Sequence, residues 1–182
     1  MSTAFRVAAL PADELERIRG RGVDDFGNGL EPETVTGGGT PLRCCLRDAE
    51  PGERVVLIAY RPATIDGPYA EVGPVFVHAE ACEGYADEGR YPEGFRSRNQ
   101  LLRAYDARGR QVENVVVDGG AAERSITGLL QRPGVAYLHS RNVLAGCYMF
   151  AVHPRRRRAQ RVVNRQTVDV RNVSWGRSTV LG

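Results

Sequence analysis

The sequence predicts an α+β fold, built as a single domain with a mainly antiparallel sheet and about two helices. Short apolar runs separated by glycine- and proline-rich turns indicate several strands. Tight turns join two pairs of these runs, as in β-hairpins. Only two segments have helical patterns, which is too few to connect a series of parallel strands. A chain of 182 residues is long enough for one domain with a substantial core.

The first predicted elements are a strand and a helix. Residues 4–10 form an apolar run, and Pro11 then begins a helix. Acidic residues fill the first turns of this helix and arginines its end, as the helix dipole favours. Gly20 and Gly22 end the helix, and residues 23–40 form a long glycine-containing loop.

Residues 42–47, 54–61 and 74–79 are the next predicted strands. The last of these is apolar apart from His78, and Cys82 follows four residues later. Alternate side chains of a strand face opposite sides, so Cys44 and Cys45 are expected on opposite faces. These two thiols would then not easily reach one metal ion.

The second half of the chain predicts a hairpin, a helix and two more strands. The hairpin covers residues 100–106 and 111–117, and the helix covers residues 121–130. The last strands are residues 134–141 and 145–152. The globular domain is therefore expected to span residues 1–153. Residues 154–182, which begin with a block of four arginines, predict a basic, flexible C-terminal extension.

All 25 cationic side chains are arginines, and the sequence contains no lysine. Schiff-base catalysis needs an amine that can lose its proton, which a guanidinium does not do. This composition excludes pyridoxal-phosphate enzymes and lysine-dependent aldolases. It also excludes the phosphate-binding loop that ends in Gly-Lys and the usual kinase lysine.

Charge and cysteine content limit the expected partners and location. Residues 1–153 carry a net charge of −4 and residues 154–182 carry +7. The acidic body has no nucleic-acid-binding motif, so the basic tail alone does not favour a nucleic-acid partner. The apolar runs are too short to span a bilayer, and the N-terminus lacks a signal-peptide pattern. Four cysteines in a chain this long do not indicate a disulfide framework, so we expect a cytoplasmic protein.

Several motifs together resemble one known family. They are the segments 41–47 (PLRCCLR), 69–79 (YAEVGPVFVHA), 101–106 (LLRAYD), 116–120 (VVDGG) and the segment around His139. In this order they resemble the bacterial family called Domain of Unknown Function 1203, from about Phe5 to Phe150. The resemblance implies a compact, soluble, single-domain protein and carries no established activity. The basic tail departs from the family pattern.

The first functional hypothesis is a cleft that binds, or binds and turns over, a small anionic metabolite. His78 and His139 are its candidate catalytic residues, because a neutral-pH imidazole can move a proton. Strand alternation places Tyr137, His139 and Arg141 on one face, and arginine forks suit carboxylates and phosphates. The candidate ligand-binding residues are Arg43, Arg103, Tyr137 and Arg141. No cofactor and no metal site is assigned under this hypothesis, and the sequence does not fix the oligomeric state.

Two other hypotheses stay open. One is a non-catalytic interaction module, in which the arginines form structural ion pairs with Glu71, Asp106 and Asp118. The other is a metal-binding protein, whose ligands would be His78, Cys82, His139 and Cys147. Thiol catalysis is not favoured, because Glu80 and Glu83 flank Cys82 and disfavour its thiolate.

Overall fold

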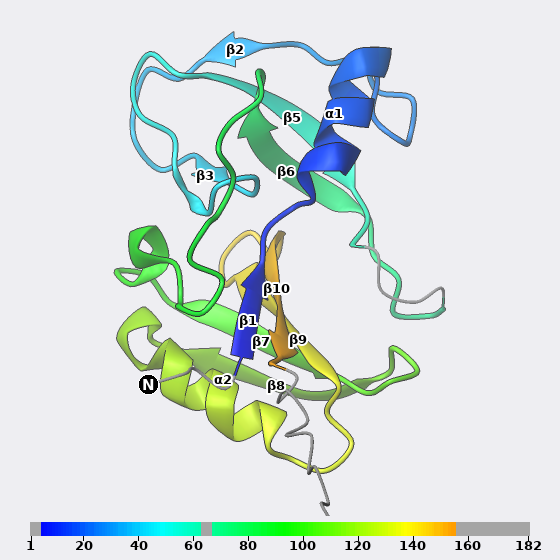
Figure 1. Ribbon diagram of the computed structural model, residues 1–182, viewed down its shortest axis with the longest axis vertical. Coiled ribbons are helices and arrows are strands. Elements are labelled where there is room, and N and C mark those ends of the chain that lie inside the picture. Colours follow the sequence, from blue (N-terminus) through cyan, green and yellow to red (C-terminus); the bar gives the residue numbers. More distant parts are fainter. Residues whose placement is uncertain (1–4, 63–66, 156–182) are drawn as a thin grey trace, which may run out of the picture.

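The computed structural model describes residues 5–62 and 67–155, which form two five-stranded sheets and two α-helices (Figure 1). The predicted α+β fold class is confirmed, with the strands divided between two sheets. In chain order the elements are β1 (Phe5–Ala8), α1 (Ala12–Arg21), β2 (Glu33–Thr34), β3 (Pro41–Leu42), β4 (Arg47–Asp48), β5 (Arg54–Tyr60), β6 (Gly73–His78), η1 (Glu93–Phe95), β7 (Gln100–Tyr105), β8 (Gln111–Val117), η2 (Gly119–Ala121), α2 (Ala122–Leu130), β9 (Tyr137–Asn142) and β10 (Tyr148–Pro154).

The first sheet has the strand order β1-β10-β9-β7-β8, and all of its pairs are antiparallel. One face of this sheet packs against α2, whose buried Ile126 and Leu129 join a core with strand residues such as Leu102, Leu138 and Phe150. The apolar positions of α2 recur at helical spacing, so that burial of this one face fixes the helix on the sheet. In Figure 1, α2 lies beside this sheet at the lower end of the molecule.

The second sheet has the strand order β2-β5-β6-β3-β4. Its long central pair is the antiparallel β5–β6, and β3 adds to β6 in parallel. The helix α1 buries Leu15 and Ile18 in the core of this sheet. This helix ends where predicted, because its C-cap Gly22 takes a left-handed conformation with φ of 71°.

The two sheets meet along β10. Tyr148 and Ala151 of that strand belong to the core of the second sheet, whereas Phe150 and Val152 belong to the core of the first. β10 thus contributes side chains to both cores, with a bulge between Tyr148 and Phe150.

One predicted strand is wrong. Residues 42–47 do not form one strand, because β3 ends at Leu42, β4 begins at Arg47 and residues 43–46 form a turn between them. The predicted hairpin and both predicted helices are present, and their boundaries differ from the predicted ones by no more than one residue. None of the helices in the described parts of the chain is long and apolar enough to cross a membrane. The basic extension predicted after residue 154 lies almost wholly outside the described residues.

Candidate metal centre

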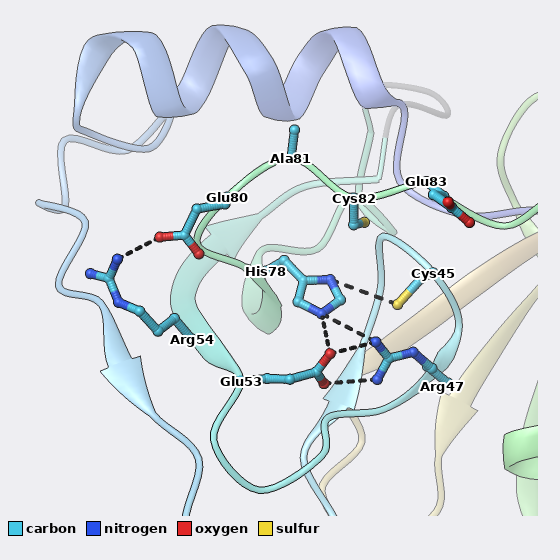
Figure 2. A pocket seen from close by; sticks show the side chains of 10 residues that line it. Cys45, Arg47, Glu53, Arg54, His78, Glu80, Ala81, Cys82 and Glu83 are labelled. Carbon is cyan, nitrogen blue, oxygen red and sulfur yellow. Dashed lines mark hydrogen bonds and ion pairs between the residues drawn. The ribbon is translucent and has the colours of Figure 1, made fainter.

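Four potential metal ligands from three segments meet at one end of β6. Figure 2 shows three of them, Cys45, His78 and Cys82. Cys44 and Cys45 lie in the turn between β3 and β4, His78 is the last residue of β6, and Cys82 follows in the next loop. Their three Sγ atoms and one imidazole nitrogen all lie within 4.8 Å of one another. Three thiols and an imidazole form a set of ligands that zinc binds in structural sites.

The turn at residues 43–46 is what brings the adjacent cysteines together. The N–H of Leu46 donates to the carbonyl of Leu42 at 3.0 Å and closes the turn. Leu46 takes a left-handed conformation, with φ of 57°, and still buries its side chain in the first core. Such a conformation is uncommon for leucine. The expectation that Cys44 and Cys45 face opposite sides is therefore wrong, because the alternation of a strand does not apply here.

Backbone N–H groups act on the three sulfur atoms of this cluster. The N–H of His78 donates to Cys44 Sγ at 3.4 Å. The backbone of Arg47 acts to lower the pKa of Cys45, and that of Gly84 acts to lower the pKa of Cys82. Hydrogen bonds to the charged form of a group favour that form, so these three donors favour thiolates, which are the metal-binding state.

The imidazole of His78 is oriented with one nitrogen toward the thiols and the other toward a carboxylate. Its Nδ1 lies 3.4 Å from Cys44 Sγ and 3.9 Å from Cys45 Sγ. Its Nε2 lies 3.3 Å from Glu53 Oε1. A carboxylate only accepts hydrogen bonds, so the tautomer with the proton on Nε2 bonds to Glu53 and leaves the lone pair of Nδ1 toward the thiols; Arg47 Nη2, a donor, lies farther from Nε2, at 3.5 Å. Carboxylates commonly hold metal-ligating histidines in this way.

Glu53 is itself held by Arg47. The guanidinium donates to the two carboxylate oxygens at 2.8 and 2.6 Å. These hydrogen bonds keep the pKa of Glu53 far below its usual range, so that the carboxylate stays charged beside His78. On the other side, Arg19 of α1 donates to the carbonyl of His78 at 2.9 Å. The end of β6 is thus fixed by a helix, a turn and an ion pair.

The thiols differ in acidity and exposure. The hydrogen bond with Cys45, followed by burial, raises the pKa of Cys44 above its usual range. The same hydrogen bond lowers the pKa of Cys45, and burial raises the pKa of Cys82. Cys44 is buried, whereas Cys45, His78 and Cys82 line a hollow of about 470 Å³. An ion can reach the cluster through this hollow.

The spacing of the ligand atoms fits a small tetrahedral ion. A zinc–sulfur bond of ~2.3 Å and a zinc–nitrogen bond of ~2.0 Å place neighbouring ligands of a tetrahedron ~3.5–3.8 Å apart. The observed 3.4 and 3.9 Å from His78 Nδ1 to the two adjacent cysteines lie close to those values. Small rotations of the side chains close the remaining gaps.

A family model described as "Protein of unknown function (DUF1203)" matches residues 39–155, which is more than half of the chain. The chain belongs to this family. The match confirms the resemblance seen in the sequence, and it contains all four residues of the cluster. No match was found among curated proteins or among solved structures.

Two of the four metal ligands that the sequence predicted belong to this cluster. His78 and Cys82 are in it, but His139 and Cys147 are not. His139 lies in β9 of the first sheet, among Tyr105, Tyr137 and Tyr148. Cys147 lies beside the guanidinium of Arg43, which donates to its sulfur at 3.0 Å.

The predicted anion pocket is divided in the structure. His78 lines the hollow beside the cysteines, whereas Tyr137, His139 and Arg141 line a separate small cavity. Arg103 and Arg141 line a third hollow next to it.

Some of the arginines form the structural ion pairs that the interaction-module hypothesis expected. Arg103 and Arg141 both pair with Glu71. Asp106 pairs with Arg110, and Asp118 accepts a hydrogen bond from the N–H of Gly120. Arg43 is buried, and its donors bind Tyr148 O, Cys147 Sγ and Pro41 O.

Sequence reasoning missed Cys44, Cys45, Arg47 and Glu53. The available signal was a His-x-x-x-Cys pair at the end of a predicted strand together with an adjacent cysteine pair. The sequence pattern did not show that the cysteine pair lies in a turn, where both thiols can point toward His78.

Proposed function

We propose that this DUF1203 protein binds a divalent, thiol-preferring metal ion, with zinc as the best fit. Its ligands are the thiolates of Cys44, Cys45 and Cys82 and the Nδ1 atom of His78. The observation that supports this most strongly is the convergence of four ligand atoms within 4.8 Å, with the backbone N–H of His78 donating to one of the sulfur atoms, Cys44 Sγ.

Four protein ligands complete a tetrahedral zinc shell and leave no position for a substrate. The proposed ion is therefore structural: it ties the turn at residues 43–46 to the end of β6 and the loop after it. Thiolates favour zinc over magnesium and calcium, which prefer oxygen ligands. The sequence assigned no cofactor and left a metal-binding protein as an open alternative; this proposal takes up that alternative with Cys44 and Cys45 in place of His139 and Cys147.

A single pocket that uses both His78 and His139 does not fit this arrangement, because the two imidazoles line different hollows. The hypothesis of a small anionic ligand depends on the residues of the first sheet alone, separate from the metal centre.

The test is metal binding by the purified protein and by single-cysteine variants. The wild-type protein should bind one zinc ion per chain, and Co²⁺ should give the intense visible absorption of a tetrahedral thiolate site. Cys44→Ser, Cys45→Ser and Cys82→Ser should each lower the affinity at least ~100-fold, because a ligand is lost.

Cys147→Ser is the matched control, because this cysteine lies outside the cluster and binds Arg43 instead. It should retain one tightly bound ion. Failure of the wild-type protein to bind zinc or cobalt, or an equal loss in Cys147→Ser, would overturn the proposal.

A further inference from the structure

Two adjoining hollows, separate from the one beside the cysteines, lie on the face of the first sheet that is turned away from α2. One is a small cavity of about 10 Å³, which has room for a single water molecule. The other has a volume of about 360 Å³, which lies in the range of small-molecule sites. Both are lined by Pro62, Glu71 and Arg141, so they adjoin at these residues.

His139, at the small cavity, is buried. The residue is 3 % exposed, and neither of its ring nitrogens has a hydrogen-bond partner among the described residues. Three tyrosine rings surround it, with centroids 4.9 to 5.3 Å away. A buried imidazole without partners is rare in native proteins and indicates a water or ligand that completes it.

Arg141 gives a second, independent indication. It is 5 % exposed, its Nε atom has no partner among the described residues, and it shares Glu71 with Arg103. Among the described residues that line the larger hollow, Glu71 is the sole carboxylate and these two arginines are the cations. This described lining therefore carries one positive charge more than negative charge, and because Arg141 is buried, the surplus favours an anion.

The remaining wall of the larger hollow is aromatic and apolar. Tyr60 and Tyr148 lie with their ring centroids 5.7 Å apart, and Val72, Pro74 and Ala145 complete the lining. Tyr60 and Tyr148 are each 6 % exposed, so a small part of each ring faces the hollow, and together with the aliphatic side chains it suits a small, flat apolar group.

We propose that this hollow binds a small aromatic monocarboxylate. Its carboxylate lies beside Glu71 and accepts hydrogen bonds from Arg103 and Arg141, and its ring packs against Tyr60 and Tyr148. A water in the small cavity links His139 to this group. One negative charge matches the one unmatched guanidinium, and the planar carboxylate fits the arginine fork. The site does not depend on the metal centre.

Benzoate is the probe, with neutral benzamide as its isosteric control, and affinity is measured by isothermal titration calorimetry. Benzoate should bind saturably with one site per chain, whereas benzamide should bind at least 10-fold more weakly. In NMR spectra the ring signals of His139, assigned with His139→Phe, should shift on addition of benzoate. Those of His78 should not.

Two substitutions should change the affinity in opposite directions. Arg103→Gln removes the surplus charge and leaves Glu71 paired with Arg141, so benzoate should bind at least 10-fold more weakly. Glu71→Gln leaves two unmatched guanidiniums, so benzoate should bind several-fold more tightly. Arg110→Gln, at an exposed arginine outside both hollows, should change nothing.

Binding that is absent, equal for benzamide, or insensitive to both Arg103→Gln and Glu71→Gln would overturn the inference. Cys82→Ser should retain benzoate binding while it loses zinc, so that a failure of one site is distinguished from a failure of the other.

Discussion

Glu53 is the residue that fixes the orientation of His78 at the proposed metal centre. It lies 3.3 Å from Nε2 of the imidazole and is held by two hydrogen bonds from Arg47. These contacts of Glu53 are with His78 and Arg47, and none of them involves a sulfur atom of the cluster. Its expected role is therefore to keep the proton on Nε2 and the lone pair of Nδ1 on the ion.

Glu53→Gln should weaken zinc binding by about 10–100-fold without changing the stoichiometry. The amide is a poorer acceptor, and it loses the ion pair with Arg47. Competition with a zinc chelator of known affinity measures the change. Glu80→Gln is the control, because Glu80 lines the same hollow and pairs with Arg54 instead. Equal affinities for Glu53→Gln and the wild-type protein would show that His78 needs no such support.

Gly119 is required for a close approach of two backbone segments. A Cβ atom at this position would lie 2.5 Å from the carbonyl oxygen of Arg96 and 2.7 Å from that of Phe95. Gly119→Ala should destabilise the protein by about 1–3 kcal/mol, because the turn before α2 and η1 must move apart. Chemical unfolding monitored by fluorescence measures the loss.

Gly128 gives the opposite expectation and serves as the comparison. It lies inside α2, and an added Cβ meets nothing within 4 Å. Gly128→Ala should stabilise the protein by about 1 kcal/mol through helix propensity alone. A stabilising effect at both positions would mean that the contact around Gly119 is looser than the structure shows.

At the scale of elements, local pattern predicted the long strands and helices well. The runs that became β5 and β6 are apolar enough to be buried whichever sheet they join. The hairpin of β7 and β8 follows from its turn sequence, and α2 from its single apolar face. These signals are contained within each segment, which is why the sequence reveals them.

The turn between β3 and β4 could not be predicted in the same way. Residues 42–47 place Leu42, Cys44 and Leu46 at alternate positions and Arg43 and Arg47 at others, as a strand with one apolar face would. The left-handed conformation of Leu46 is maintained by tertiary contacts, since its side chain is buried in the first core. The residues of the candidate metal cluster were therefore only half predicted, because Cys44 and Cys45 depend on that turn.

Zinc should protect this turn and the end of β6 from hydrogen exchange. The N–H of His78 donates to Cys44 Sγ and that of Arg43 to Phe76 O, so both bonds break when the turn separates from the strand. Exchange of these two amides should slow at least 10-fold when zinc is added to the metal-free protein. NMR-detected exchange measures it.

Amides of β7 and β9 are the internal control, because they pair within the first sheet and lie away from the ligands. Their exchange should change less than that of the turn. Equal protection of the turn, the end of β6, β7 and β9 would indicate that zinc stabilises the whole fold and does not hold the turn to β6 locally.

At the scale of the whole molecule, the division into two sheets was not visible in the sequence. It depends on pairings between distant segments, such as β1 with β10 and β3 with β6. The same division explains why the two candidate histidines separate. His78 ends a strand of one sheet and His139 lies within a strand of the other.

Burial of His139 links the stability of the whole fold to pH. Burial, and then the charge of Arg141, lower the pKa of His139 to about 3. An exposed histidine in the unfolded chain has a pKa of about 6.5. The unfolded state therefore binds the proton first, and the stabilising contribution is complete above about pH 6.5 and declines as the pH falls toward 3.

The free energy of unfolding should thus fall by up to about 1.4 kcal/mol per pH unit between pH 6 and pH 5 because of His139. His139→Phe keeps a ring among the tyrosines and removes the titration, so its unfolding free energy should depend less on pH. Urea unfolding of both proteins, with a chelator present to remove metal effects, measures the difference.

A smaller pH dependence should remain in His139→Phe, because burial also lowers the pKa of His153. Paired carboxylates such as Glu53 add to the pH dependence of the free energy of unfolding mainly below about pH 4.3, the usual pKa of a free glutamate. That range lies below the interval from pH 6 to pH 5 in which His139 is tested. Equal slopes for the two proteins between pH 6 and pH 5 would mean that His139 takes up its proton in the folded protein. The ring of tyrosines would then admit a charged imidazole, and the cavity beside it would be open to solvent.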